Sequence, residues 1–202
     1  MKTEHEKYAG WQVSQGLKDP TFWDRHSHAE FKAVKRFLSK PPQRILDLGC
    51  GLGRVATYFS KCYSSPPTQY YLADSNGATP TWGWDAPTGF YNDLKLTEEY
   101  VQQQGLKQYE IVDLSTNKLE TLKDIDLVVS FLAVGFHYPI ETYMPILQNI
   151  ISKHAVLAFG VRRNKYNLHS FSKLFPYSHM TALRTLTTDG KRTHEDVLIL
   201  TR

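Results

Sequence analysis

The stretch RILDLGCGLGRV, residues 44 to 55, constrains the fold of this chain more than any other part of the sequence. Apolar residues and one carboxylate, Asp47, lead into a Gly-x-Gly-x-Gly pattern formed by Gly49, Gly51 and Gly53. Apolar side chains then recur at helical spacing. Glycines between a strand and a helix permit a sharp turn and bring backbone amides close to a ligand. The stretch therefore predicts a strand, a ligand-binding turn and a helix in succession.

The remainder of the chain alternates between strand and helix patterns. Apolar runs predict strands at residues 45–48, 69–74, 108–114, 124–134 and 155–161, and helical patterns occur at 27–39, 54–62, 94–104, 140–152 and 167–174. Ser27 and Glu30 are expected to cap the first helix as a capping box. Residues 75–93 predict a loop, and Asp189-Gly190 predicts a closing hairpin between two strands. Strands separated by helices indicate an α/β fold with a mostly parallel seven-stranded sheet, a C-terminal antiparallel hairpin and helices on both faces.

Length and composition indicate one enzyme-sized domain. A chain of 202 residues buries roughly 70% of its unfolded surface, which is enough for one substantial core. We expect a single domain over residues 1–202, with residues 1–40 as an N-terminal helical lid and 41–202 as the core. Cys50 and Cys62 are the only cysteines, which are too few for a disulfide framework and lack zinc-site spacing.

The charge balance and hydropathy of the chain indicate which kinds of partner it can bind. The 24 basic against 20 acidic residues give a net charge of +4, which is far from the balance of a dedicated nucleic-acid binder. No stretch approaches the ~20 apolar residues of a membrane span, and the N-terminus is charged where a signal peptide would be apolar. The sequence therefore predicts a cytoplasmic protein without a membrane partner and argues against a nucleic-acid partner.

Two further carboxylates end neighbouring predicted strands. Asp74 closes the second strand and is placed to accept hydrogen bonds from the two hydroxyls of a ribose, and Asp113 closes the third, within reach of an adenine amino group. The third glycine of the loop comes too early for the dinucleotide fingerprint, which argues against NAD. A nucleoside-shaped ligand fits this set.

The motif ILDLGCGLGRV, followed by Asp74 and Asp113, resembles that of class I S-adenosylmethionine-dependent methyltransferases. The resemblance covers residues 44–202 in element order and implies a Rossmann-like fold that binds S-adenosylmethionine and releases S-adenosylhomocysteine. It implies that the donor is contacted by Asp47, Gly49, Cys50, Gly51, Gly53, Asp74, Ser75, Asp113, Leu114, Ser130 and Phe131.

The acceptor side is expected after the fourth strand, where the chain reads SFLAVGFHYP, residues 130–139. In the resembling family this segment lies beside the transferred methyl group, and here it lacks the Asn/Asp-Pro-Pro-aromatic signature of methylation on nucleic-acid bases. An imidazole ordinarily has a pKa of about 6.5, so His137 could accept a proton from a hydroxyl near neutral pH. A structural histidine held by a backbone carbonyl, or substrate binding without proton transfer, are the alternatives.

Aromatic and basic residues supply candidate walls for the acceptor. These residues are Trp23, Arg25, His26, Trp82, Trp84, Tyr91, Phe136 and Tyr138. His26 and His28 stand two residues apart and do not share a helix face, so no metal pair is expected.

The predicted activity is methyl transfer from S-adenosylmethionine to a hydroxyl of a small molecule. Two loops, GWDAPTGFYNDL and SFLAVGFHYPIETY, resemble those of sugar O-methyltransferases, which implies a sugar or sugar nucleotide as acceptor. Methylation of a small amine, of tRNA or of a protein, and nucleoside binding without catalysis, are the alternatives.

Overall fold

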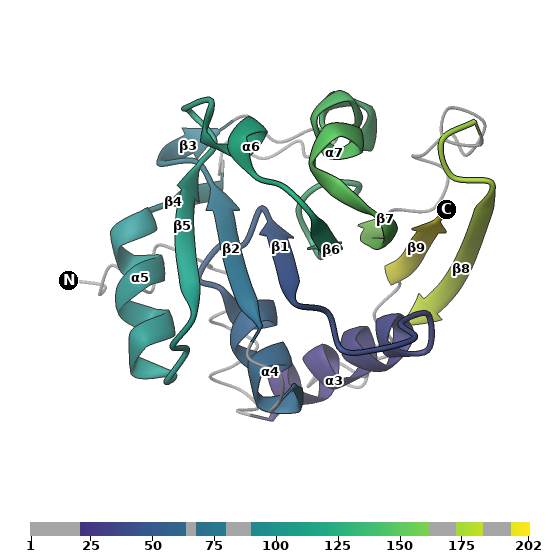
Figure 1. Ribbon diagram of the computed structural model, residues 1–202. Helices are drawn as coiled ribbons and strands as arrows, with labels where there is room; N and C mark the ends of the chain where they lie inside the picture. Colours follow the sequence, from purple (N-terminus) through teal and green to yellow (C-terminus); the bar gives the residue numbers. More distant parts are fainter. Residues whose placement is uncertain (1–20, 64–67, 80–89, 162–172, 184–194) are drawn as a thin grey trace.

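A seven-stranded sheet forms the centre of the computed structural model, which describes residues 21–63, 68–79, 90–161, 173–183 and 195–202 (Figure 1). The strands lie in the order β5-β2-β1-β6-β7-β9-β8. Their bounds are β1 (Arg44–Leu48), β2 (Gln69–Asp74), β5 (Tyr109–Asp113), β6 (Ile125–Ser130), β7 (Ile151–Val161), β8 (Tyr177–Leu183) and β9 (Glu195–Thr201). All neighbours pair in parallel except β9, which is antiparallel to both β7 and β8.

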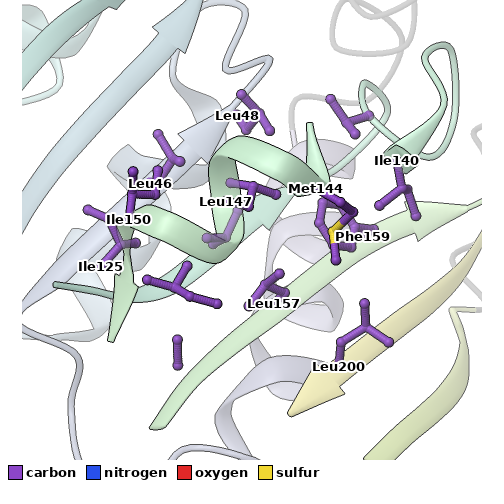
Figure 2. Packing of buried hydrophobic residues seen from close by; sticks show 14 of the residues in the cluster. Leu46, Leu48, Ile125, Ile140, Met144, Leu147, Ile150, Leu157, Phe159 and Leu200 are labelled. Atoms are coloured by element: carbon purple, nitrogen blue, oxygen red, sulfur yellow. The ribbon is translucent and has the colours of Figure 1, made fainter. Parts of the chain in front are cut away.

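Helices cover both faces of the sheet. One face carries α3 (Phe22–Lys35), α4 (Arg54–Cys62) and α5 (Leu94–Gln103), and the other carries α6 (Lys118–Thr121), the 3-10 helix η1 (Ile140–Thr142) and α7 (Met144–Ile150). Strand side chains alternate between the two cores, so that Ile45 packs with the α3 and α4 side and Leu46 with the α7 side. Figure 2 shows the second core, in which Leu147 and Ile150 of α7 lie near Leu46 of β1.

This architecture confirms the predicted α/β class, with its mostly parallel sheet and C-terminal antiparallel hairpin. β9 inserts between β7 and β8, so the second strand of the hairpin is internal rather than at the edge. The turn at Asp189-Gly190 lies outside the described residues. No helix in the described ranges is long and apolar enough to cross a membrane.

The predicted start of the first helix is wrong. α3 begins at Phe22 after the N-cap residue Thr21, and both Ser27 and Glu30 are buried in its interior. Because they lie inside the helix rather than at its N-terminus, they cannot form a capping box, and their side chains accept hydrogen bonds from Arg54. The helix also ends at Lys35, ahead of the predicted residue 39.

Other predicted segments also differ from the structure, and the strand expected at 124–134 ends at Ser130, the last residue of β6. The helix expected at 140–152 divides into η1 and α7, with Pro145 in the first turn of α7, and β7 begins at Ile151 rather than at 155. The loop expected at 75–93 contains two short antiparallel strands, β3 (Gly77–Thr79) and β4 (Phe90–Asn92). Of the helix expected at 167–174, residues 167–172 lie outside the described residues, and Lys173 and Leu174 form a turn.

Candidate active site

The glycine loop, residues 49–53, connects β1 to α4 at the carboxyl ends of the parallel strands. Gly49, Gly51 and Gly53 all have positive φ, at 73°, 53° and 79°. The Gly51 amide donates a hydrogen bond to Asp74 Oδ2 at 2.8 Å, and the Ser75 amide donates to Asp74 Oδ1 at 2.8 Å. The loop and the end of β2 thus converge on one carboxylate.

The surroundings of the glycine loop explain its composition. A Cβ added at Gly49 would overlap the Cβ of Ala133, and one at Gly53 would lie 2.6 Å from Val101 Cγ1. A Cβ at Gly51 would meet nothing within 4 Å. Gly49 and Gly53 are therefore required by close packing, whereas the loop is open at Gly51, where a ligand can approach the backbone.

Asp47 of β1 and Cys50 of the loop itself are both buried. The Asp47 carboxylate is buried and accepts a hydrogen bond from the Ala56 amide of α4 at 3.3 Å. Burial raises the pKa of Asp47 to about 7, although the nearby Arg54 charge opposes the rise. Burial also raises the pKa of the Cys50 thiol, which therefore stays protonated and is a packing residue rather than a nucleophile.

Asp113 lies beside Asp74 but is engaged differently. The two residues are register partners across the β2 and β5 pair, and both are half-buried. Asp113 Oδ1 accepts a hydrogen bond from the Ser115 amide at 2.9 Å, which closes the turn after β5. The Leu114 amide donates to the Asp74 carbonyl at 2.9 Å. The carboxyl ends of β2 and β5 therefore bring together Asp74, Ser75, Asp113 and Leu114.

The His137 loop, residues 131–138, follows β6 and touches the glycine loop through Ala133. Ser130 at the end of β6 is buried, and its hydroxyl donates to the Leu48 carbonyl and accepts from the Val134 amide at 2.9 Å. Ser130 thus joins β1 to the His137 loop, and Phe131 is buried beside it. Ser130 thus supports the loop that follows β6 rather than facing solvent.

Backbone hydrogen bonds hold His137 in a tight turn. The His137 amide donates to the Ala133 carbonyl at 2.6 Å, and the Gly135 amide donates to the Tyr138 carbonyl at 2.6 Å. Leu132 has a φ of 63°, which costs a non-glycine residue about 1–3 kcal/mol and is typical of functional turns. The His137 side chain is buried, and its ring centre is 5.0 Å from that of Phe136, whereas Phe136 and Tyr138 are half-buried.

The candidate acceptor residues of the N-terminal segment lie on α3 and differ in their surroundings. Trp23 is half-buried, and its ring lies 5.0 Å from the guanidinium carbon of Arg54. Arg25 is exposed and donates to Thr21 at the start of the same helix. Trp82 and Trp84 lie outside the described residues, and for Tyr91 only its backbone in β4 is described.

His26 is buried within a group of charged residues that the sequence did not predict. Its Nε2 lies 3.0 Å from Glu195 Oε2 and 3.3 Å from Glu30 Oε1. Arg54 binds both oxygens of Glu30, at 2.7 and 2.9 Å. No local pattern signals this group, which we call the charged cluster (His26, Glu30, Arg54 and Glu195), because its members come from α3, α4 and β9.

No protein-family model and no curated protein matches the sequence. Solved structures do match. A SAM-dependent methyltransferase from Aquifex aeolicus is 19% identical with a TM-score of 0.57, and the match covers 92% of this chain and 95% of that one. The plantazolicin methyltransferase BpumL, solved with SAH, is 13% identical with a TM-score of 0.54, and 95% and 89% are covered.

A protein from Nostoc punctiforme assigned as an O-methyltransferase is 12% identical with a TM-score of 0.59. The match covers 87% of this chain and 56% of that one, so this chain spans little more than half the length of the Nostoc protein. Together with the strand order and the glycine loop, these likenesses establish that the chain has the class I S-adenosylmethionine-dependent methyltransferase fold.

Proposed function

We propose that this protein transfers a methyl group from S-adenosylmethionine to a hydroxyl of a small molecule, with a sugar or sugar nucleotide as the acceptor class. The observation that carries the proposal is the contact between the glycine loop and the His137 loop, at Gly49 and Ala133. A donor held by the first loop would therefore lie beside the candidate base on the second.

The residues of the glycine loop fit a nucleoside donor. Asp74 already accepts two backbone hydrogen bonds, and its carboxylate has the chemistry that ribose hydroxyls require. The open side of Gly51 leaves room for a ligand against the backbone, and Asp113 and Leu114 lie on the neighbouring strand end. When bound, S-adenosylmethionine supplies a methyl group on a positively charged sulfur, which is already activated for displacement.

The protein then has to align the acceptor and remove its proton. His137 is the proposed base, because it lies in a loop whose backbone is fixed by several hydrogen bonds and which contacts the donor loop. Phe136 and Tyr138 flank it and offer ring faces to a sugar. A hydroxyl gains more than an amine from a positioned base, since it is the weaker nucleophile while it keeps its proton.

The test combines donor binding with transfer. S-adenosylhomocysteine is titrated into the protein by calorimetry, and radiolabelled S-adenosylmethionine is then offered with matched panels of monosaccharides, nucleotide sugars and their amino analogues. We expect donor-product binding and label transfer to hydroxyl compounds. His137→Gln should lower kcat by about a hundredfold or more while the Kd for S-adenosylhomocysteine stays within about threefold.

The matched control is His154→Gln, which changes an exposed histidine on β7. It should leave both binding and turnover unchanged. Absence of S-adenosylhomocysteine binding by the wild-type protein would refute the proposal. Label transfer to the amino analogues alone would refute the hydroxyl assignment and leave the methyltransferase assignment in place.

A further inference from the structure

The charged cluster is buried between three elements and plays no part in the proton transfer proposed above. His26 and Glu30 come from one face of α3, Arg54 is the first residue of α4, and Glu195 is the first residue of β9. His26, Glu30 and Glu195 are each no more than 2% exposed. Charges are costly to bury unless they are paired, so the arrangement needs an explanation.

The residues of the cluster shift one another's pKa values. Burial alone would lower the pKa of His26, but Glu30 and Glu195 raise it to about 9, so the ring is an imidazolium at neutral pH. Burial raises the pKa of Glu195, whereas Arg54 and His26 outweigh burial at Glu30 and lower its pKa to about 2. The Arg54 guanidinium and the His26 imidazolium thus face the carboxyl groups of Glu30 and Glu195.

A divalent metal is the alternative occupant, because the ligand atoms of His26, Glu30 and Glu195 lie within 4.8 Å of one another. The metal would have to displace the His26 proton, since a protonated imidazole cannot act as a ligand. It would also lie against the Arg54 guanidinium, which holds both oxygens of Glu30. The contacts therefore favour the imidazolium as the bridge between the two carboxylates.

One side of the cluster leads to the glycine loop. Arg54 directly follows Gly53, the N-cap residue of α4, and its guanidinium turns back to Glu30 and to the ring of Trp23. Its charge also acts on Asp47, whose carboxylate accepts the Ala56 amide in the first turn of α4. The position of Arg54 therefore affects the end of the loop that the donor is proposed to contact.

The other side of the charged cluster leads to the His137 loop. Glu195 lies against Gly160 near the end of β7, where a Cβ would overlap Glu195 Oε1 and lie 3.3 Å from the Leu132 amide nitrogen. Leu132 belongs to the His137 loop. The cluster thus spans from the glycine loop to the His137 loop, with His26 in contact with both carboxylates.

We infer that His26 is a positioning residue for donor binding: its imidazolium, shared between Glu30 and Glu195, fixes α3 against α4 and β9 and so holds the glycine loop in its binding shape. This inference rests on the proposed function. It assigns α3 to the framework of the donor site, whereas the sequence placed His26 on a wall of the acceptor site.

The test measures the Kd for S-adenosylhomocysteine by calorimetry in the wild type, His26→Gln, Glu195→Gln and His28→Gln. His28 is the matched control, because it lies on the same helix but is exposed and contacts Tyr58 instead. At neutral pH we expect His26→Gln and Glu195→Gln to raise the Kd about tenfold, within the usual range of coupling between sites. His28→Gln should match the wild type.

A pH series separates positioning from a general loss of structure. The ratio of the His26→Gln Kd to the wild-type Kd should fall towards one as the pH rises above about 9, because the wild-type imidazolium then loses its proton. Because both proteins bind the same ligand, the ratio removes the effect of the titration of the amino group of S-adenosylhomocysteine. Thermal unfolding of each variant verifies that it is folded. If His26→Gln does not fold, Glu195→Gln takes its place in the test.

The outcomes are distinguishable. If the wild type binds no S-adenosylhomocysteine, the proposed function and this inference fail together. If the wild type binds it but a folded His26→Gln or Glu195→Gln behaves like His28→Gln, the inference alone is refuted. A Kd ratio that stays constant across the pH series would refute the role of the His26 proton.

Discussion

Gly51 and Gly53 have similar backbone conformations but different surroundings. Both have positive φ, which side chains with a Cβ rarely adopt. Gly53 also packs against Val101 of α5, whereas Gly51 has open space around the position of a Cβ. Glycine is therefore needed at both positions because of the backbone conformation. At Gly53 it is needed for close packing as well.

This difference predicts unequal costs of substitution. Gly51→Ala should lower the free energy of unfolding by about 1–2 kcal/mol, the cost of the left-handed conformation. Gly53→Ala should lose about 1–3 kcal/mol more, because its methyl group would lie 2.6 Å from Val101 Cγ1. Urea denaturation of the two variants measures the difference, and equal losses would contradict the packing argument.

Among the elements, α5 has a first turn whose backbone amides are bound by two different side chains. Asp93 is its N-cap residue, and Asp93 Oδ1 accepts hydrogen bonds from the amides of Lys95 and Leu96 at 2.9 and 3.4 Å. Asn76, which precedes β3, accepts the Leu94 amide at 2.9 Å. These acceptors satisfy amides that the helix itself cannot pair.

We predict that Asp93→Ala lowers the free energy of unfolding by about 1 kcal/mol, the usual cost of losing an N-cap side chain. Glu99→Ala is the control on the same helix, because its ion pair with Lys95 is exposed and 4.0 Å long. It should change stability by less than about 0.5 kcal/mol. Denaturant titration of both variants tests the prediction, which fails if the two variants lose the same stability.

Elements whose signals are local could be predicted from the sequence. β2 was predicted with its observed bounds, because an apolar run ends there in a carboxylate. The glycine loop and Asp74 were found in the same way, since a strand, glycines and a helix follow one another directly. The start of α3 was missed, because its N-terminal part is held by burial of Phe22 and His26, and Thr21 makes no side-chain cap hydrogen bond.

The charged cluster could not be predicted, because its contacts connect distant parts of the chain. His26 and Glu195 are 169 positions apart, and the glycine loop gave no indication that Arg54 turns back to Glu30. The role of His137 stays a prediction. The structure adds that its loop touches the glycine loop, a contact that depends on the absence of a Cβ at Gly49.

At the scale of the whole molecule, the buried ionisable groups make folding depend on pH. His26 has a pKa of about 9 in the folded state against 6.5 ordinarily, so its contribution is complete below 6.5 and is lost as the pH rises to 9. Glu30 has a pKa of about 2 against 4.5, so its contribution is lost as the pH falls from 4.5 to 2. Asp47, raised from 3.8 to about 7, favours the folded state less as the pH rises through that interval.

We therefore predict that the free energy of unfolding falls between pH 6.5 and pH 9, by up to about 3 kcal/mol from His26. His26→Gln should remove this part of the pH dependence, and His28→Gln should retain it. Urea denaturation at several pH values across this interval provides the measurement. A wild-type stability that stays constant from 6.5 to 9 would show that His26 is not protonated in the fold.

The internal position of β9 has a consequence for biosynthesis. β7 and β8 are both made before β9, yet β9 separates them in the sheet. Until β9 emerges from the ribosome, the apolar edge of β7 has no partner from this hairpin and is open to pairing with other chains. Completion of the sheet must therefore wait for the end of translation of this region, and a nascent chain held before that point would be the form most prone to aggregate.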